Sequence, residues 1–332
     1  MLEYEEEYIS ALLKEAERFR GIEACTVYLG GGTPSVLSGK SLNRLMSGLG
    51  DIFKISENAE ITIEINPKTA DREKLMIFKD LGINRLSVGI QSFNKNTLKT
   101  LGRIHSSEDA KNVVSEAEKL GFDNISADLM FSVPNQTAEE FENDIKTAVN
   151  LGVHHVSCYG LKIEPGTVFY KKGVQCLPDE TDRRMYARAK EILEENGFFR
   201  YEISNFAKPG KRSQHNLLYW KCREYVGLGC GAHSYLNGER YSNIKDIKKY
   251  ISSCGSVHEN VCVLSEHDKT EESLIMGMRL EEGADCGLVR RLGTEKVLEK
   301  YIENGYIKKE NEKIKFTDKG FDVSNYILSE LI

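Results

Sequence analysis

The chain has 332 residues, of which 40% are hydrophobic and 29% are charged, and its net charge is −6. This composition describes a folded chain long enough for one large domain and one small one. The negative charge excludes a general attraction to phosphate backbones, so nucleic acid is not an expected partner. No apolar run approaches the roughly 20 residues of a membrane span, and the acidic N-terminus is unlike a signal peptide. We therefore expect a cytoplasmic protein.

The chain opens on a predicted amphipathic helix and then alternates strands with helices. The predicted strands cover 25–29, 61–66, 85–91, 124–131, 155–163 and 199–204. This alternation is typical of βα units with a parallel sheet. Six such strands predict an open, partial (β/α)6 barrel of the TIM type or a doubly wound sheet rather than a closed eight-stranded barrel. Because such a protein usually begins on a strand, we expect that the first strand is missing.

A short pattern recurs at the predicted helix ends, where Leu-Gly is followed by an apolar residue and a new strand. The glycines are Gly82, Gly121, Gly152 and, in a weaker fourth copy, Gly197. A glycine at this place can take the left-handed conformation that closes a helix. The helix that follows Thr137 is expected to begin with a capping box to Glu140.

Beyond about residue 265 the pattern changes to three short helices, a hairpin that turns near Asn311, and a closing helix, which is a winged-helix order. Such domains often bind DNA, but residues 266–332 hold 11 Lys and Arg against 15 Asp and Glu, a net charge of −4. A packing or lid role is therefore favoured, and DNA binding stays an alternative. The predicted parts are a barrel (1–205), a connecting segment (206–264) and a winged-helix-like α+β domain (265–332).

The eight cysteines are scattered along the chain. The closest pairs, Cys222 with Cys230 and Cys254 with Cys262, are eight residues apart, which fits neither zinc nor compact iron–sulfur spacing. Reduced thiols are expected rather than disulfides. The sequence therefore predicts no metal held by cysteines of this chain alone.

A glycine-rich loop, Gly30-Gly31-Gly32-Thr33, joins the first predicted strand to a helix. Without Cβ atoms its backbone N–H groups can approach a small charged ligand, while Thr33 offers a hydroxyl. Two acids, Glu64 and Asp128, lie in apolar strands that end at the same edge of the sheet. A single acid of this kind is more often a satisfied structural carboxylate, but two beside a glycine loop favour a ligand site.

Five motifs follow one another in a fixed order. They are Gly30-Gly-Gly-Thr-Pro-Ser35, Glu64-Ile-Asn-Pro67, Val88-Gly-Ile-Gln-Ser-Phe93, Leu101-Gly-Arg103 and Asp128-Leu-Met130 with Pro134-Asn-Gln-Thr137. Over nearly the whole chain they resemble the radical S-adenosylmethionine proteins of the oxygen-independent coproporphyrinogen oxidase family. The resemblance implies that the cofactor S-adenosylmethionine is bound by Gly31, Gly32, Thr33, Glu64, Gln91, Arg103 and Asp128.

The residue types agree with that implication. A carboxylate suits an ammonium group or ribose hydroxyls, and an arginine fork suits a carboxylate. Taken alone, Arg103 would be interpreted as a surface charge at a helix end. It is a candidate cofactor residue only because it lies among the other motifs of the family.

The segment His215-Asn-Leu-Leu-Tyr-Trp220 contains the only tryptophan and resembles the HNxxYW motif of the family's HemW branch, the haem chaperones. Histidine can bind haem iron through a ring nitrogen, and aromatic side chains can line a macrocycle. The resemblance implies that His215 binds haem, whereas without it a hydrogen-bonded loop histidine is the commoner outcome. Cys222 is a weaker candidate ligand and is expected to be a buried thiol.

A second glycine-rich turn, residues 227–235, resembles the family's GxGAHSY segment. Its His233 can be a ligand or a structural residue, and both interpretations stay open. His154 and His155 lie at a helix-to-strand junction, and we expect them to be structural.

Members of the family hold a 4Fe–4S cluster on CxxxCxxC or CxxxCxC after their first strand, and this sequence contains neither motif. A cluster needs converging thiolates and one open iron for S-adenosylmethionine. We therefore do not expect the chain as given to cleave the cofactor. A shortened N-terminus is the expected explanation, and a natural cluster-free relative is the other.

The resemblance thus implies a haem chaperone that binds haem or porphyrin and passes it to an acceptor protein. The alternative within the family is an oxygen-independent coproporphyrinogen III oxidase, which converts two propionates to vinyl groups through a 5′-deoxyadenosyl radical.

Overall fold

The structure is a computed structural model that describes residues 2–332. The chain forms two compact units. Residues 25–39 and 58–212 make up the first, which we call the barrel unit. Residues up to 24, 40–57 and 213–332 make up the second, which we call the composite unit. Within residues 2–332, no helix has the length and apolar character needed to cross a membrane.

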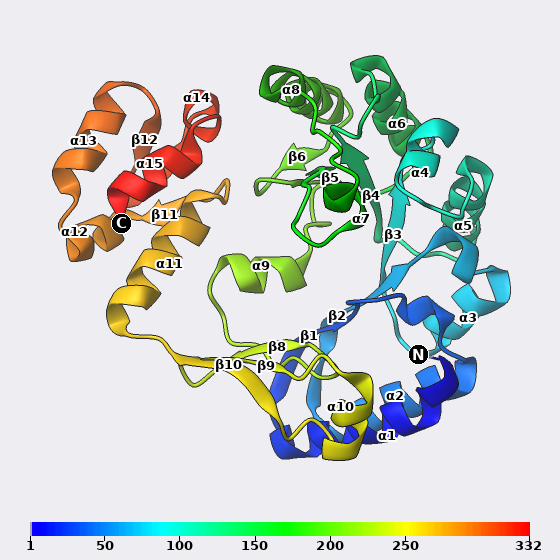
Figure 1. The fold of residues 1–332 in the computed structure, drawn as a ribbon. Helices are drawn as coiled ribbons and strands as arrows, with labels where there is room; N and C mark the ends of the chain where they lie inside the picture. The colour runs from blue at the N-terminus through cyan, green and yellow to red at the C-terminus, as the bar shows by residue number, and fades with distance from the viewer. Residues whose placement is uncertain (1) are drawn as a thin grey trace. The chain divides into compact units, whose positions relative to one another are not determined.

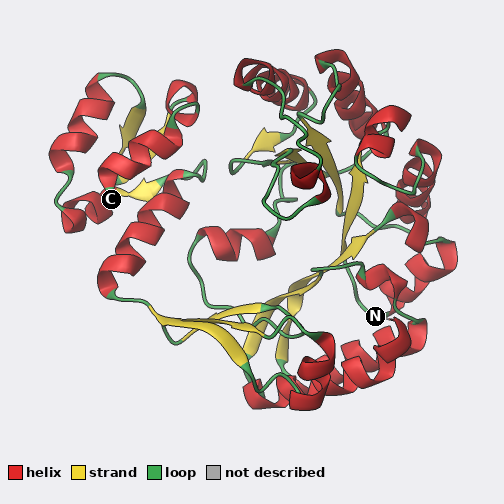
Figure 2. Cartoon of the chain, in the orientation of Figure 1, coloured by secondary structure: helices red, strands yellow, loops and turns green. Residues whose placement is uncertain are grey.

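A seven-stranded sheet forms the centre of the barrel unit (Figures 1 and 2). Its strands are β1 (Glu23–Leu29), β2 (Lys54–Ile65), β3 (Arg85–Gln91), β4 (Ile125–Phe131), β5 (His155–Gly160), β6 (Phe199–Arg200) and β7 (Asn205–Ala207). In space their order is β1-β2-β3-β4-β5-β7-β6. Strands β2 to β5 pair in parallel, while β7 and β6 are antiparallel to their neighbours. The sheet curls as part of a βα barrel does, which confirms the predicted fold class.

Helices cover the outer face of this sheet (Figure 1). They are α3 (Arg72–Asp80), α5 (Ser107–Lys119), α6 (Ala138–Asn150) and α8 (Asp179–Glu195), while the shorter α4 (Lys95–Thr100) and α7 (Val168–Lys171) belong to the connections after β3 and β5. The recurring glycines close helices as predicted, with φ of +78° at Gly82, +78° at Gly121, +77° at Gly152 and +80° at Gly197. The capping box of Thr137 and Glu140 is also present.

Alternation along β4 separates the core from the candidate site. Ile125, Ala127 and Leu129 are at most 1% exposed and lie on the face that packs against helices. Because successive side chains of a strand point to opposite faces, Ser126 and Asp128 point to the inner face of the curled sheet. The inner face is therefore polar where the outer face is apolar.

The sixth predicted strand, 199–204, is wrong in its extent. Residues 201–204 form the turn between β6 and β7, and the Tyr201 N–H donates to Asn205 O at 3.1 Å. Glu202 is only 1% exposed and accepts from the Ser204 N–H at 3.1 Å. One oxygen of this buried carboxylate is thus held by the backbone of its own turn, while Oε1 has no hydrogen-bond partner among the described residues.

The composite unit holds a second, three-stranded antiparallel sheet of β8 (His233–Leu236), β9 (Glu239–Asn243) and β10 (His258–Val263). Its first helices are α1 (Glu5–Ala16), α2 (Gly39–Ile52), α9 (Gln214–Trp220) and α10 (Ile247–Ser253). The contacts between α1 and α10 bring distant parts of the chain together within this unit.

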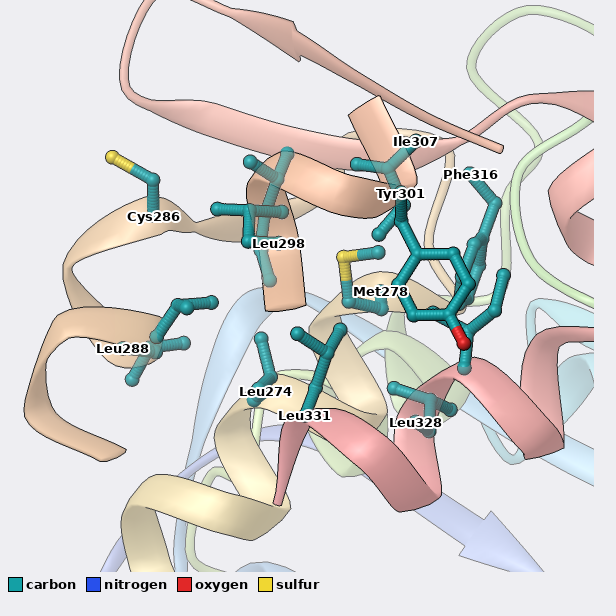
Figure 3. Close-up of a cluster of buried hydrophobic side chains, with 14 residues drawn as sticks. Leu274, Met278, Cys286, Leu288, Leu298, Tyr301, Ile307, Phe316, Leu328 and Leu331 are labelled. Carbon is teal, nitrogen blue, oxygen red and sulfur yellow. The ribbon is translucent and has the colours of Figure 1, made fainter. Parts of the chain in front are cut away.

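The last part of the composite unit has the predicted winged-helix order. It consists of α11 (Glu266–Met278), β11 (Ala284–Asp285), α12 (Cys286–Leu292), α13 (Glu295–Glu303), β12 (Ile307–Glu310), β13 (Lys313–Phe316), α14 (Asp318–Phe321) and α15 (Ser324–Leu331). The hairpin turns at Asn311, whose φ is +56°. Figure 3 shows the apolar core, in which Leu274, Met278 and Leu331 are among the fully buried or nearly buried side chains.

Candidate functional site

The backbone of the loop after β1 is exposed to solvent. Gly30, Gly31 and Gly32 are exposed, and Gly31 has a φ of +80°. A Cβ atom on Gly30 would lie 2.5 Å from the ring of Tyr28 and 2.7 Å from Oε1 of Glu64. A side chain at position 30 would therefore displace Tyr28 and Glu64, which already occupy the space.

The rest of this loop is anchored beside the end of β2. Thr33 is half-buried, and Ser35, which is fully buried, lies 2.5 Å from the hydroxyl of Thr69. Thr69 in turn donates to Asn66 O at 2.8 Å. These bonds fix the glycine loop against the short helical turn that follows β2.

Glu64 lies one residue before the end of β2 and faces the glycine loop. Its Oε1 accepts from the Tyr28 hydroxyl at 2.9 Å, and the Gly31 N–H also bonds to the carboxylate. Burial is the largest cause of the raised pKa of Glu64, and the negative charge of Asp128 raises it further against these two hydrogen bonds. A cationic ligand would relieve both effects.

Asp128 is held by three serine hydroxyls from three neighbouring strands. Ser87 donates to Oδ2 at 2.8 Å, and Ser157 and Ser126 donate to Oδ1 at 2.8 and 3.2 Å. All three serines are buried, whereas Asp128 is half-buried. Because these donors fix both oxygens, the carboxylate is oriented before any ligand arrives.

Two other predicted cofactor residues lie at the end of β3 and in the chain segment after it. Gln91 is the last residue of β3, is half-buried, and has a φ of +65°. Arg103 follows α4, where its N–H donates to Leu98 O at 2.9 Å, and its side chain is exposed. The structure thus brings the glycine loop, Glu64 and Asp128 together, with Gln91 at the same end of the sheet.

His215 lies on α9 in the composite unit. Its Nε2 is 2.9 Å from the hydroxyl of Tyr219, and the two rings meet edge to face with centroids 4.9 Å apart. The spacing of four residues places both side chains on one helix face. Tyr219 also packs edge to face on Tyr225, with ring centroids 4.6 Å apart, and burial is the main cause that raises its pKa to about 12.

Cys222 follows this helix in a left-handed conformation, with a φ of +50°. It is half-buried rather than buried, and its thiol hydrogen-bonds to Ser273. Burial is the largest cause of its raised pKa, so the thiol stays protonated and is a poor ligand in this state.

The second glycine-rich turn surrounds a buried acid that the sequence analysis missed. Glu15 of α1 is 1% exposed and accepts from the Gly229 N–H at 2.9 Å and from Nδ2 of Asn243 at 2.6 Å. The Tyr250 hydroxyl also donates to it. His233 is exposed at the start of β8. The geometry of this turn is accounted for by packing around Glu15.

The two histidines at the start of β5 have structural contacts. His155 is fully buried, with Nδ1 2.8 Å from the Ser126 hydroxyl and Nε2 2.9 Å from that of Tyr201. His154 is half-buried, and its Nδ1 accepts from the Ile125 N–H at 3.4 Å. These contacts agree with the structural role predicted for both.

A cluster of metal-binding side chains is not found among residues 2–332. No group of three or more His, Cys, Asp or Glu in this range is placed to hold a metal ion, and all eight cysteines are free. The residues present do not fit a 4Fe–4S cluster, which needs converging thiolates.

Comparison with known proteins gives consistent results. The sequence matches the radical SAM superfamily over residues 2–148. The heme chaperone HemW of Lactococcus lactis is 34% identical over 98% of this chain and 89% of its own length, and that of Bacillus subtilis is 38% identical over 84% and 75%. The solved coproporphyrinogen III oxidase from Escherichia coli superposes with a TM-score of 0.86 over 100% of this chain and 84% of its own, at 21% identity, a likeness that shows the fold alone.

Proposed function

Because the chain belongs to the HemW family of radical S-adenosylmethionine proteins, we propose that it binds haem and transfers it to an acceptor protein. The observation that carries the proposal is the pairing of His215 with Tyr219. His215 is half-buried and Tyr219 is 38% exposed, so both side chains can be reached by a large planar ligand.

The chemistry of this pair suits haem. A neutral imidazole coordinates haem iron through one ring nitrogen, and the hydrogen bond at the other nitrogen sets the tautomer and the orientation of the ring. Tyr219 stays protonated at neutral pH, since burial raises its pKa to about 12. The aromatic side chains of Tyr219 and Trp220 offer apolar surface to the macrocycle.

We also propose that the barrel unit binds S-adenosylmethionine. The proposed contacts are Gly31, Gly32 and Thr33 for the methionyl end, and Glu64, Gln91, Arg103 and Asp128 for the other polar groups. The raised pKa of Glu64 supports this assignment, because a bound cation would favour its carboxylate form. Beside a reduced iron–sulfur cluster, S-adenosylmethionine supplies radical chemistry. Since residues 2–332 offer no cluster ligands, the cradle is proposed as a binding site only.

Oxidation of coproporphyrinogen III is not extended to this chain. The solved oxidase shares the fold of this chain at 21% identity, and a likeness at that level does not carry the substrate of the oxidase over to this chain.

The proposal is tested by titrating the protein with haem and following the Soret band. We expect saturable binding, with His215→Ala raising the Kd about tenfold or more. His267→Ala is the matched control, because His267 is an exposed histidine on α11 of the same unit. Equal binding by wild type and His215→Ala would remove His215 from the haem site.

Transfer is tested separately. Haem-loaded protein is mixed with a haem-free respiratory haem protein, and the absorption spectrum of the acceptor is followed. We expect the haem to reach the acceptor faster than it dissociates spontaneously from the donor protein. A rate equal to spontaneous dissociation would leave a binding protein without chaperone activity.

A further inference from the structure

The end of β3 bends sharply at Gln91. The Ser92 N–H donates to Ile90 O at 2.8 Å, and the φ of Gln91 between them is +65°. A hydrogen bond from residue i+2 to residue i, with a positive φ at the central residue, defines the rare and strained form of the γ-turn. Strain of this kind persists only where the surroundings hold it. Glycine would remove the strain, yet this position carries an amide side chain.

His105 holds the turn from one side. Its ring is 4% exposed, and Nε2 lies 2.9 Å from Ile90 O, the same carbonyl that accepts from Ser92. A carbonyl can only accept, so Nε2 carries the proton and donates. Nδ1 is buried without a hydrogen-bond partner. His105 therefore directs the hydrogen bond of its Nε2 to the residue before Gln91.

Asp144 of α6 holds the turn from the other side. It is 2% exposed, and it accepts from the Ser92 hydroxyl at Oδ2, at 2.6 Å, and from the Phe93 N–H at Oδ1, at 2.7 Å. The Ser92 oxygen also accepts from the Asn94 N–H at 2.9 Å. The two residues after Gln91 are thus fixed by one carboxylate.

The two clamps converge on a single residue. His105 fixes the residue before Gln91, and Asp144 fixes the two residues after it. Burying a carboxylate and an imidazole with an unpaired nitrogen costs folding free energy, and a loop that only connected two elements would not need either buried group. What the two groups achieve together is one backbone conformation at Gln91.

We propose that His105 and Asp144 are positioning residues that keep Gln91 in the strained turn, so that its side-chain amide is oriented before S-adenosylmethionine binds. The inference rests on the proposed S-adenosylmethionine site of the barrel unit. A preformed turn raises affinity because the ligand does not have to order the loop.

A double-mutant cycle tests the proposal. Calorimetry with S-adenosylmethionine is done on wild type, Asp144→Asn, Gln91→Ala and the double variant. We expect Asp144→Asn to weaken binding about tenfold in the wild-type background and less than about twofold in the Gln91→Ala background. Equal weakening in both backgrounds would overturn the proposal, since Asp144 would then act on the site in general.

Milder and matched variants accompany the cycle. Ser92→Ala removes one hydrogen bond to Asp144 and disturbs the fold less than Asp144→Asn does. We expect it to lower S-adenosylmethionine affinity about threefold, an effect that also disappears in the Gln91→Ala background. His105→Phe keeps the ring and removes the donor, and the same coupling is expected. Asp80→Asn is the control, because Asp80 is an exposed carboxylate of the same unit.

A measurement without ligand separates this inference from the proposed function. Gln91→Gly relieves the strain, so it should raise the melting temperature of wild type and have little effect in Asp144→Asn, where the clamp is released. Failure of wild type to bind S-adenosylmethionine would contradict the proposed function. Normal binding of S-adenosylmethionine together with no stabilisation by Gln91→Gly would contradict only the positioning role of His105 and Asp144.

Discussion

The proposed S-adenosylmethionine cradle of the barrel unit and the HNxxYW segment of the composite unit hold their candidate functional side chains by different means. In the cradle, Asp128 receives three hydrogen bonds from buried serines, and Glu64 is held by Tyr28 and by backbone. In the segment, Nε2 of His215 lies 2.9 Å from the Tyr219 hydroxyl, and the ring of Tyr219 packs edge to face on that of Tyr225.

This difference is what the two proposed ligands require. A small, charged cofactor is recognised by polar groups fixed in advance, where low local dielectric strengthens each bond. A cargo that must later leave needs a ligand residue that can change its partner, and a partly exposed pair on a seven-residue helix can do so at low cost. We therefore expect a rigid cradle and an adaptable segment.

The largest expected effect concerns the buried acids of the barrel unit. Burial is the largest cause that raises the pKa of Glu202 to about 7, from 4.5 in an unfolded chain. The folded state therefore holds its proton more tightly, and the stability from this group is complete below pH 4.5 and is lost as the pH rises through 7. At about 1.4 kcal/mol per pKa unit, the loss is about 3 kcal/mol.

Glu202→Gln should remove this part of the pH dependence. Urea denaturation of wild type and variant at pH 5 and pH 8 measures it, and Asp144, whose pKa burial raises to about 6, is common to both proteins. Glu180→Gln, an exposed position in the same unit, should keep the wild-type slope. A variant with the same slope as wild type would show that Glu202 is ionised in the folded state across this range.

The second prediction fills the space at Gly30. A Cβ atom there would meet Tyr28 and Glu64 at 2.5 and 2.7 Å, so Gly30→Ala must displace both side chains. Overpacking of this kind costs about 1–3 kcal/mol, and the same free energy taken from ligand binding would lower S-adenosylmethionine affinity about 5- to 150-fold. Haem binding should not change.

Gly50→Ala is the control for this substitution, because nothing lies within 4 Å of its Cβ position on α2. It should leave S-adenosylmethionine affinity as in wild type. If Gly30→Ala binds the cofactor normally, the loop is not part of the cradle, and the contrast with the HNxxYW segment fails.

The acids at the edge of the sheet could be predicted as candidate site residues because charged side chains are unexpected in apolar strands. Acids such as Glu64 and Asp128 stand out in apolar strands, and glycines at helix ends have a backbone reason that sequence alone reveals. The positive φ of Gly82 and the capping box of Thr137 confirm this local reasoning.

The supporting residues could not be predicted, because their burial comes from tertiary contacts. Asp144 is one acid in an amphipathic helix, where solvent exposure is the ordinary expectation, and only the packing of α6 beside the loop after β3 buries it. Glu15 is hidden in the same way within α1. The turn at 201–204 was missed because alternation continues through it while Glu202 folds inward.

The smallest effect is expected in the HNxxYW segment. Tyr219→Phe keeps the ring contacts with His215 and Tyr225 and removes only the hydroxyl that lies 2.9 Å from Nε2. Since that bond orients an imidazole that is partly open to solvent, its loss should raise the haem Kd about fivefold, below the usual range for buried metal ligands. Soret titration measures the change, and Tyr170→Phe, an exposed tyrosine of the barrel unit, is the control.

Kinetics then decide whether the segment is adaptable in the sense that transfer requires. If Tyr219 competes with haem for the His215 nitrogen, the hydroxyl assists release, and Tyr219→Phe should bind haem more tightly and transfer it more slowly. If Tyr219 only orients the ring, the variant should bind haem more weakly and transfer it faster. The first pattern would replace the orienting role proposed for Tyr219 with a release role, and unchanged affinity and rate would remove the hydroxyl from haem handling altogether.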